Sequence, residues 1–263
     1  MAIYSFLIAI KNHDLELPKV AIEKTVPRQL SEMKDVLLDP SHLEFDCTIY
    51  KSFRGVCLEA DKPLFVNNHL RHDLTIVPPG TLNGEFAKTY GHYHPKMQVR
   101  QLAKTYPEIY QVISGSALFL LQDGPEQLTD VKFIFGQKGD VVVIPPNFAH
   151  TTINFTKEDL VLANLVADIF EANYEIFKNK HGASFYVLEN HPLVWYPNPN
   201  YQNLPEPFLV KPKKIFKKPY LYEIFKQNPS QFTWLIEPNQ FPYQLNDLFE
   251  ESSWNEIKMN LKT

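Results

Sequence analysis

The sequence predicts a mainly β protein, built as a barrel or sandwich of short antiparallel strands. Its central part holds a series of runs of four to nine residues, rich in Val, Ile, Phe and Thr and bounded by Gly, Pro, Asn or Asp. No long helical pattern separates these runs, which excludes a regular alternation of strands and helices. Glycines stand at the joints, at Gly80, Gly115, Gly124 and Gly139, where tight turns are expected.

The elements are expected in the following order. The apolar run at residues 2–10 is a candidate first strand or dimer arm. Residues 30–38 carry apolar side chains at helical spacing, and Asp39-Pro40 ends that helix. Strand-like runs follow at residues 48–59, 74–80, 108–122, 131–136, 139–146, 150–156 and 160–169.

Composition divides the chain into three segments. Residues 1–46 are expected to form an N-terminal arm and helix that pack on the barrel or on a partner. Residues 47–190 form the barrel itself. Residues 191–263 contain ten of the twenty-one prolines and no glycine, and they are rich in aromatic residues and lysine. This segment is therefore predicted to be an extension laid over the barrel or a partner subunit.

Net charge, the length of the apolar runs and the number of cysteines indicate the compartment and exclude some kinds of partner. The net charge is −4, so no overall basic field attracts nucleic acid. No apolar run approaches the roughly 18 residues that a membrane span needs. Two cysteines, Cys47 and Cys57, are too few for a disulfide framework and favour a reducing compartment. We therefore expect a cytoplasmic protein without a nucleic-acid or membrane partner.

Three motifs together predict a metal site. In Gly91-His92-Tyr93-His94 the two histidines stand two residues apart, so that in a strand both imidazoles point to one face. Such a pair alone is often a surface or packing feature. Here Glu108 opens a later strand-like run, with no other Asp or Glu between His94 and Glu108, and His150 follows Pro145-Pro146. Three imidazoles and one carboxylate suit Fe²⁺, Mn²⁺, Ni²⁺ or Zn²⁺ and leave open positions for a ligand.

With these motifs the chain resembles the cupin superfamily, whose two metal motifs correspond to GHYH…E and PPNFAH. More narrowly, it is similar to the cupin-type glucose-6-phosphate isomerases over about residues 25–190. The shared segments are RQLSEMKDVLLD, LTIVPPG, KTYGHYHP, PEIYQVISG, PPNFAHTTIN and ANYEIF. The resemblance implies a cupin double-stranded β-helix, or jelly-roll barrel, with a few short helices and extensions at both ends.

The resemblance also implies an activity and a set of site residues. The activity is the metal-dependent interconversion of glucose 6-phosphate and fructose 6-phosphate in glycolysis and gluconeogenesis, with iron as the favoured ion. His92, His94, Glu108 and His150 would hold the ion, with Glu108, His92 and His150 as the catalytic set. The residues expected to contact the phosphorylated sugar are Thr75, Thr89, Gly91, Tyr110, Tyr174 and Tyr50. Asn154 and Gln122 are expected to support the site or close a turn, and a homodimer is the expected assembly.

One departure from the family pattern concerns the loop before Glu108. Archaeal members place the glutamate soon after the second histidine, whereas here residues 97–106 lengthen the connection. A longer loop costs little closure entropy, but it can reshape the mouth of the pocket and so the substrate preference.

Several functional alternatives stay open from the sequence. The same ion could serve a dioxygenase, a decarboxylase or a mannose-type sugar isomerase, and a cupin without turnover could simply bind sugar phosphates. For an isomerase, hydrogen could move through an enediol with Glu108 as the base, or as a hydride. A carboxylate bound to a cation is a weaker base than a free one, so the residues favour neither route.

Overall fold

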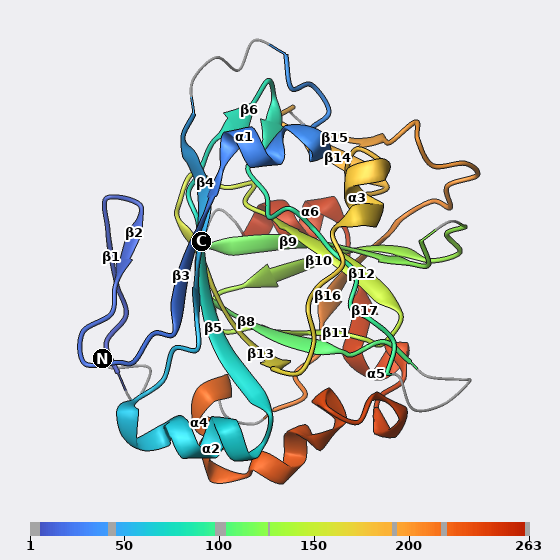
Figure 1. The fold of residues 1–263 in the computed structure, drawn as a ribbon. Coiled ribbons are helices and arrows are strands. Elements are labelled where there is room, and N and C mark those ends of the chain that lie inside the picture. The colour runs from blue at the N-terminus through green and yellow to red at the C-terminus, as the bar shows by residue number, and fades with distance from the viewer. Residues whose placement is uncertain are drawn as a thin grey trace.

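The computed structural model describes residues 6–41, 46–97, 104–125, 127–190, 194–216 and 220–260. Two large β-sheets pack face to face, with short helices at both ends of the barrel that they form (Figure 1). The two faces enclose one apolar core, to which Phe119 and Phe133 from one sheet and Leu74 and Ile109 from the other contribute fully buried side chains. The predicted mainly β architecture is thereby confirmed.

The first large sheet has six antiparallel strands and carries most of the side chains discussed below. Its order is β11 (Val141–Ile144), β8 (Glu108–Ser114), β13 (Leu160–Ala167), β5 (Leu70–Val77), β4 (Thr48–Arg54) and β3 (Lys24–Gln29). The central strand β13 is buried along its whole length. A strand covered on both faces is expected to be a nearly continuous apolar run, as β13 is.

The second large sheet combines barrel strands with strands from the end of the chain. Its order is β12 (Phe148–Ile153), β9 (Ser116–Asp123), β10 (Val131–Gln137), β16 (Phe208–Pro212) and β17 (Phe249–Glu251). The β10–β16 pair is parallel and the other pairs are antiparallel. The C-terminal segment thus extends the barrel sheet by backbone hydrogen bonds.

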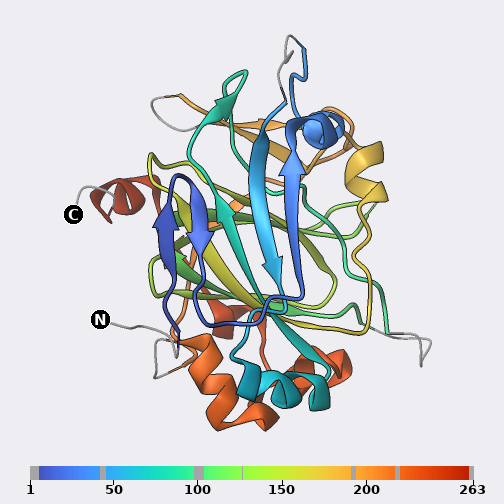
Figure 2. The same cartoon turned by 60° about the vertical axis from the view of Figure 1, so that its left-hand side comes forward.

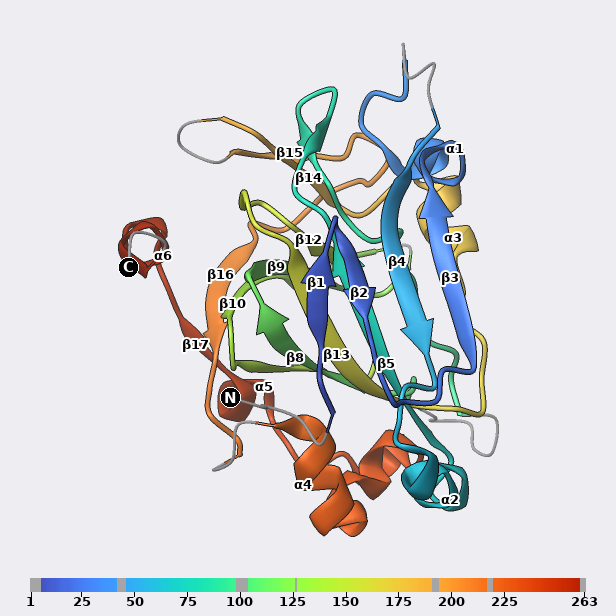
Figure 3. The ribbon, with the colours of Figure 1, turned by 90° about the vertical axis from the view of Figure 1, so that its left-hand side faces the viewer.

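Two smaller β elements flank the barrel. The hairpin of β1 (Ala9–Lys11) and β2 (Asp14–Glu16) lies on the outer face of the six-stranded sheet (Figure 3). A four-stranded sheet at one end contains β15 (Val194–Pro197), β14 (Phe185–Leu188), β7 (Glu85–Phe86) and β6 (Thr81–Leu82).

The helices are short, and most of them lie at the two ends of the barrel (Figure 3). At one end α1 (Leu30–Met33) lies beside α3 (Glu175–Asn179) (Figure 2). At the other end α2 (Lys62–Asn67) packs on α4 (Leu221–Gln227), with the Phe65 and Phe225 rings 4.9 Å apart. The remaining α-helices are α5 (Leu245–Leu248) and α6 (Trp254–Asn260). Short 3₁₀ helices span Lys34–Val36, Glu59–Asp61, Pro229–Leu235 and Pro238–Gln240.

Three local predictions differ from the structure. Residues 1–5, with the start of the predicted first strand, lie outside the described part of the chain, and among the residues described from Phe6 onward strand pairing begins at Ala9. The helix predicted at residues 30–38 is limited to α1 and one 3₁₀ turn, because the chain is extended again at Leu37. The segment with His92 and His94 contributes a single bridge to His150 rather than a continuous strand.

Among the described residues, no helix is long and apolar enough to cross a membrane. Both cysteines are free thiols; Cys47 is exposed and Cys57 is buried. Burial raises the pKa of the Cys57 thiol to about 11, so this thiol is protonated at neutral pH.

Candidate functional site

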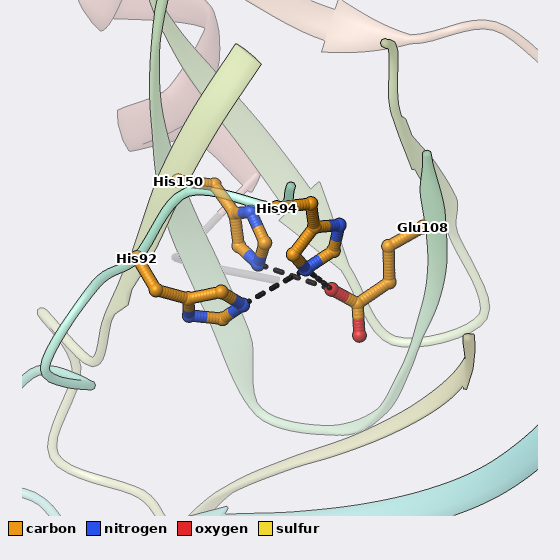
Figure 4. A group of neighbouring side chains, drawn as sticks. All are labelled: His92, His94, Glu108 and His150. Carbon is orange, nitrogen blue, oxygen red and sulfur yellow. Dashed lines mark hydrogen bonds and ion pairs between the residues drawn. The ribbon is translucent and has the colours of Figure 1, made fainter. Parts of the chain in front are cut away.

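The structure brings His92, His94, Glu108 and His150 together inside the barrel (Figure 4). Each offers one ligand atom, and these four atoms all lie within 4.8 Å of one another. His94 Nε2 and His150 Nε2 both lie 3.3 Å from Glu108 Oε2. The ligand types and their convergence are those of a divalent metal site.

Backbone pairing between distant segments holds the histidines in place. The amides of His92 and His150 each donate to the carbonyl of the other residue at 3.2 Å. Glu108 is the first residue of β8, directly after Pro107. Two hydrogen bonds join the segment before Glu108 to the turn before His150. Thr105 N donates to Asn147 Oδ1 at 3.1 Å, and Asn147 N donates to Thr105 Oγ1 at 2.6 Å.

The imidazoles of His92 and His94 face one another. His94 Nδ1 lies 2.8 Å from the Tyr106 carbonyl, which accepts its proton and leaves Nε2 unprotonated. That Nε2 lies 3.0 Å from His92 Nε2. Burial, with the neighbouring His150 and His94, lowers the pKa of His92 well below its usual range, so its imidazole is neutral. Two imidazole nitrogens this close can share one proton or coordinate one cation.

Glu108 supplies the second observation that fits a cation. Its Oε1 accepts a hydrogen bond from Asn164 Nδ2 at 2.6 Å, which fixes the carboxylate. Its Oε2 is buried and has no hydrogen-bond partner among the described residues, because the two imidazole contacts lack hydrogen-bond geometry. A buried carboxylate oxygen without a donor is a position that a cation would satisfy.

A cavity of about 520 Å³ opens beside this cluster. His92, His94 and Glu108 line it, whereas His150 lies behind Tyr110, whose hydroxyl is 3.0 Å from His150 Nε2. The residues predicted to contact substrate all line the same cavity: Tyr50, Thr75, Thr89, Gly91, Tyr110 and Tyr174. The predicted site residues are thus brought to one place by strands that are far apart in the sequence.

The hydroxyls predicted to bind phosphate are preorganised by neighbouring groups. Thr75 Oγ1 lies 3.0 Å from Ser52 Oγ on the adjacent strand. Thr89 Oγ1 accepts from the Thr152 amide at 2.9 Å and lies 3.3 Å from Thr151 Oγ1.

The backbone conformation and the local packing also explain why residue 91 is a glycine, apart from any ligand that approaches it. Its φ of +81° is a conformation that favours glycine, and a Cβ there would lie 2.6 Å from Phe177 Cε1. The packing of α3 against the histidine segment therefore requires a glycine at this position.

Three arginines in the cavity wall were missed from the sequence: Arg28, Arg54 and Arg71. The alternation of side chains along a strand could have indicated two of them. Arg54 follows Tyr50 and Ser52 at intervals of two residues, so it shares their face of the strand. Arg71 precedes Thr75 by four residues and so shares the face of Thr75. Arg28 contacts Tyr50 OH at 3.3 Å and lies over the rings of Tyr90 and Tyr174.

Gln122 and Asn154 are expected from the sequence to support the site or close a turn. Gln122 Nε2 donates to Tyr93 OH at 2.8 Å, between the two histidines of the GHYH motif. Asn154 Nδ2 donates to the Val77 carbonyl, closing a turn away from the cluster. The lengthened loop at residues 97–106 lies largely outside the described part of the chain, since residues 98–103 are not described.

Comparison with known proteins gives one family and several relatives. The family model described as glucose-6-phosphate isomerase matches residues 27–203, more than half of the chain. The chain is 27% identical to glucose-6-phosphate isomerase from Thermococcus litoralis over 194 residues, covering 72% of this chain and 94% of that protein. It is 30% identical to glucose-6-phosphate isomerase from Thermococcus onnurineus over 180 residues, covering 67% and 86%.

Solved structures give a more distant similarity. Oxalate decarboxylase from Bacillus subtilis at pH 4.6 is 22% identical, with a TM-score of 0.32, over 45% of this chain and 25% of that one. A similarity this low says nothing about the reaction.

Proposed function

The chain belongs to the glucose-6-phosphate isomerase family, and we propose that it interconverts glucose 6-phosphate and fructose 6-phosphate at the cluster of His92, His94, Glu108 and His150. The reaction is an aldose–ketose isomerisation, so the enzyme is an intramolecular oxidoreductase. The observation that supports this site most strongly is the convergence of the four ligand atoms beside a cavity lined by the family's predicted substrate contacts.

The residues present fit a divalent ion, since the buried Glu108 Oε2 has no hydrogen-bond partner among the described residues and the Nε2 atoms of His92 and His94 converge at 3.0 Å. His92 Nε2, His94 Nε2, His150 Nε2 and a carboxylate oxygen of Glu108 would hold it. A bound ion would act as a Lewis acid on the oxygens of the first two sugar carbons. We propose iron as the native ion, with manganese, zinc and nickel as substitutes, because mixed imidazole and carboxylate ligands suit these metals.

The protein's own groups would orient the sugar relative to the cluster. Thr75, Thr89 and the backbone of Gly91 are proposed to bind the phosphate, and Tyr110, Tyr174 and Tyr50 to contact the sugar hydroxyls or the phosphate. Holding the phosphate at one end of the cavity fixes the reacting carbons at the other, which lowers the entropic part of the barrier.

Hydrogen must move between the first and second carbons of the sugar. Glu108 is the carboxylate of the cluster, and Asn164 holds its Oε1 in place. If hydrogen moves as a proton, Glu108 is the group proposed to carry it between the carbons. If it moves as a hydride, Glu108 serves only as a ligand. Incorporation of solvent hydrogen at either carbon during turnover distinguishes the two routes.

We also propose a cytoplasmic homodimer that acts in glycolysis and gluconeogenesis. Support for the dimer comes from exposed apolar side chains near the N-terminal hairpin, where Leu7 is 58% exposed and Ile10 is 40% exposed. Such residues suit a contact with a second copy of the chain.

A coupled assay tests the proposed function directly. Fructose 6-phosphate added to the metal-loaded protein is expected to yield glucose 6-phosphate, detected by glucose-6-phosphate dehydrogenase and NADP. Because the reaction is redox-neutral, no oxygen uptake and no release of carbon dioxide should accompany it. Absence of product with each of Fe²⁺, Mn²⁺, Zn²⁺ and Ni²⁺ would refute the isomerase, and gas exchange would favour the dioxygenase or decarboxylase alternative.

A further inference from the structure

Arg54 occupies a position in the cavity that the proposed function does not use. It is the last residue of β4 and lines the cavity with Tyr50 and Ser52, at alternate positions of one strand face. Ser52 is in turn 3.0 Å from Thr75 on the neighbouring strand. Ser52 and Thr75 thus form a pair of hydroxyls at the proposed phosphate site, and Arg54 is the next residue after Ser52 on the same face of β4.

Asp73, a carboxylate that interacts with the charge of Arg54, already accepts hydrogen bonds from another arginine and from a backbone amide. Asp73 Oδ1 accepts from Arg71 Nε at 2.8 Å and from the Gly55 amide at 3.0 Å, and Oδ2 accepts from Arg71 Nη2 at 3.0 Å. Arg71 Nη1 also donates to Asp168 Oδ1 at 2.6 Å. Burial alone would lower the pKa of Arg71, but the two carboxylates raise it above its usual value. Arg71 and these carboxylates thus satisfy one another.

This arrangement leaves the Arg54 guanidinium without a counter-ion. Within the described ranges, the Arg54 side chain makes no hydrogen bond and no ion pair. Its charge interacts with Asp73 only at longer range. The third arginine of the wall, Arg28, is occupied by Glu32 Oε1 at 3.1 Å and by Tyr50. Among the described lining residues outside the His–Glu cluster, the exposed carboxylate of Glu171 also has no ion-pair partner.

An unpaired guanidinium in a cavity wall is a donor fork that suits a phosphate monoester. We propose that Arg54 binds the phosphate of the sugar substrate, together with the hydroxyl of Thr75, and so selects phosphorylated over free sugars. The inference rests on the proposed function for the identity of the ligand. Its structural basis is the Arg71–Asp73 pairing, which keeps Asp73 from neutralising Arg54.

The test compares binding of fructose 6-phosphate and of fructose by isothermal titration calorimetry, using Mn²⁺-loaded protein. Arg54→Gln is expected to weaken binding of fructose 6-phosphate by roughly 10- to 100-fold, as expected for the loss of charge-assisted hydrogen bonds. Binding of fructose should stay unchanged. Arg54→Lys keeps the positive charge but loses the two parallel N–H donors of the guanidinium. Its affinity for fructose 6-phosphate is expected to lie between those of the wild type and Arg54→Gln.

Lys51→Gln is the matched control, because Lys51 stands on the same strand but pairs with Asp14 outside the cavity. It should bind both sugars as the wild type does, and thermal melting of every variant checks folding. Arg54→Gln protein that binds fructose 6-phosphate as tightly as the wild type overturns the inference. Equal affinity of the wild type for both sugars overturns it too. Wild-type protein that binds fructose 6-phosphate without converting it contradicts the proposed function and leaves the Arg54 comparison valid.

Discussion

Replacing His150 by alanine is expected to abolish metal binding and to lower isomerase activity by more than 100-fold. Even the loss of a residue that only supports a metal ligand costs about 10- to 100-fold in affinity or activity, and His150 is proposed as a ligand itself. Its Nε2 lies 3.3 Å from Glu108 Oε2, and its ligand atom lies within 4.8 Å of those of the other three residues. His92→Ala should behave in the same way.

Metal content by mass spectrometry and activity by the coupled assay check this expectation together. His181→Ala is the matched control, since His181 is exposed and lies outside the cluster; it should keep full metal content and rate. The ligand assignment is wrong if His150→Ala protein retains one metal ion per chain. If the Tm of the His150→Ala protein is close to that of metal-stripped wild-type protein, the loss of metal and activity is not caused by unfolding.

The C-terminal segment is expected to be essential for stability, and Phe225→Ala measures this. Phe225 on α4 is fully buried and contacts Phe65 of α2 at 4.9 Å and Phe232 at 5.7 Å. Removing a buried phenyl ring leaves a cavity and lowers the free energy of unfolding by about 3 to 5 kcal/mol. For a chain of this size that corresponds to a fall of about 10 °C in Tm.

Denaturant unfolding and thermal melting give these quantities. Phe208→Ala provides the control, because Phe208 belongs to the same segment but is 56% exposed. Its replacement should change the free energy of unfolding by less than about 1 kcal/mol. Equal and small effects of the two substitutions would mean that α4 does not contribute to the folded core. A large effect of Phe225→Ala alone would mean that residues beyond the family match at 27–203 fold with the barrel.

Local sequence patterns carried most of the information about the barrel and the cluster. The alternation of apolar runs and turn residues predicted the strands. The residues proposed as ligands could be predicted because imidazoles two apart, a glutamate at a strand start and a histidine after Pro145-Pro146 form a combination that is seldom accidental. Their meeting point follows from the bridge between His92 and His150, which pairs segments almost sixty residues apart in the sequence.

The arginines of the cavity could not be assigned from local patterns, because their roles depend on which strands become neighbours. Arg71 satisfies Asp73 two residues away, and Asp168 comes from the end of a different strand. Whether Arg54 stays unpaired depends on this competition for Asp73. A sequence shows the charges of these residues but not which partner each one obtains.

The C-terminal strand pairing had no signal for a similar reason. β16 joins the barrel sheet as a parallel neighbour of β10, with Phe133 opposite Leu209. Parallel pairing across so long a connection depends on tertiary packing rather than on a turn that a motif could reveal. The prolines of this segment predicted an irregular extension and gave no indication of the buried residues on α4.

The most direct measurement of the central proposal is the isomerase rate of one protein sample before metal removal, after it, and after metal is restored. Chelation is expected to abolish formation of glucose 6-phosphate from fructose 6-phosphate, and one equivalent of Fe²⁺ or Mn²⁺ per chain should restore it. The reason is that Glu108 and the three histidines can act on the sugar only with an ion between them. An undiminished rate in metal-free protein would contradict the account.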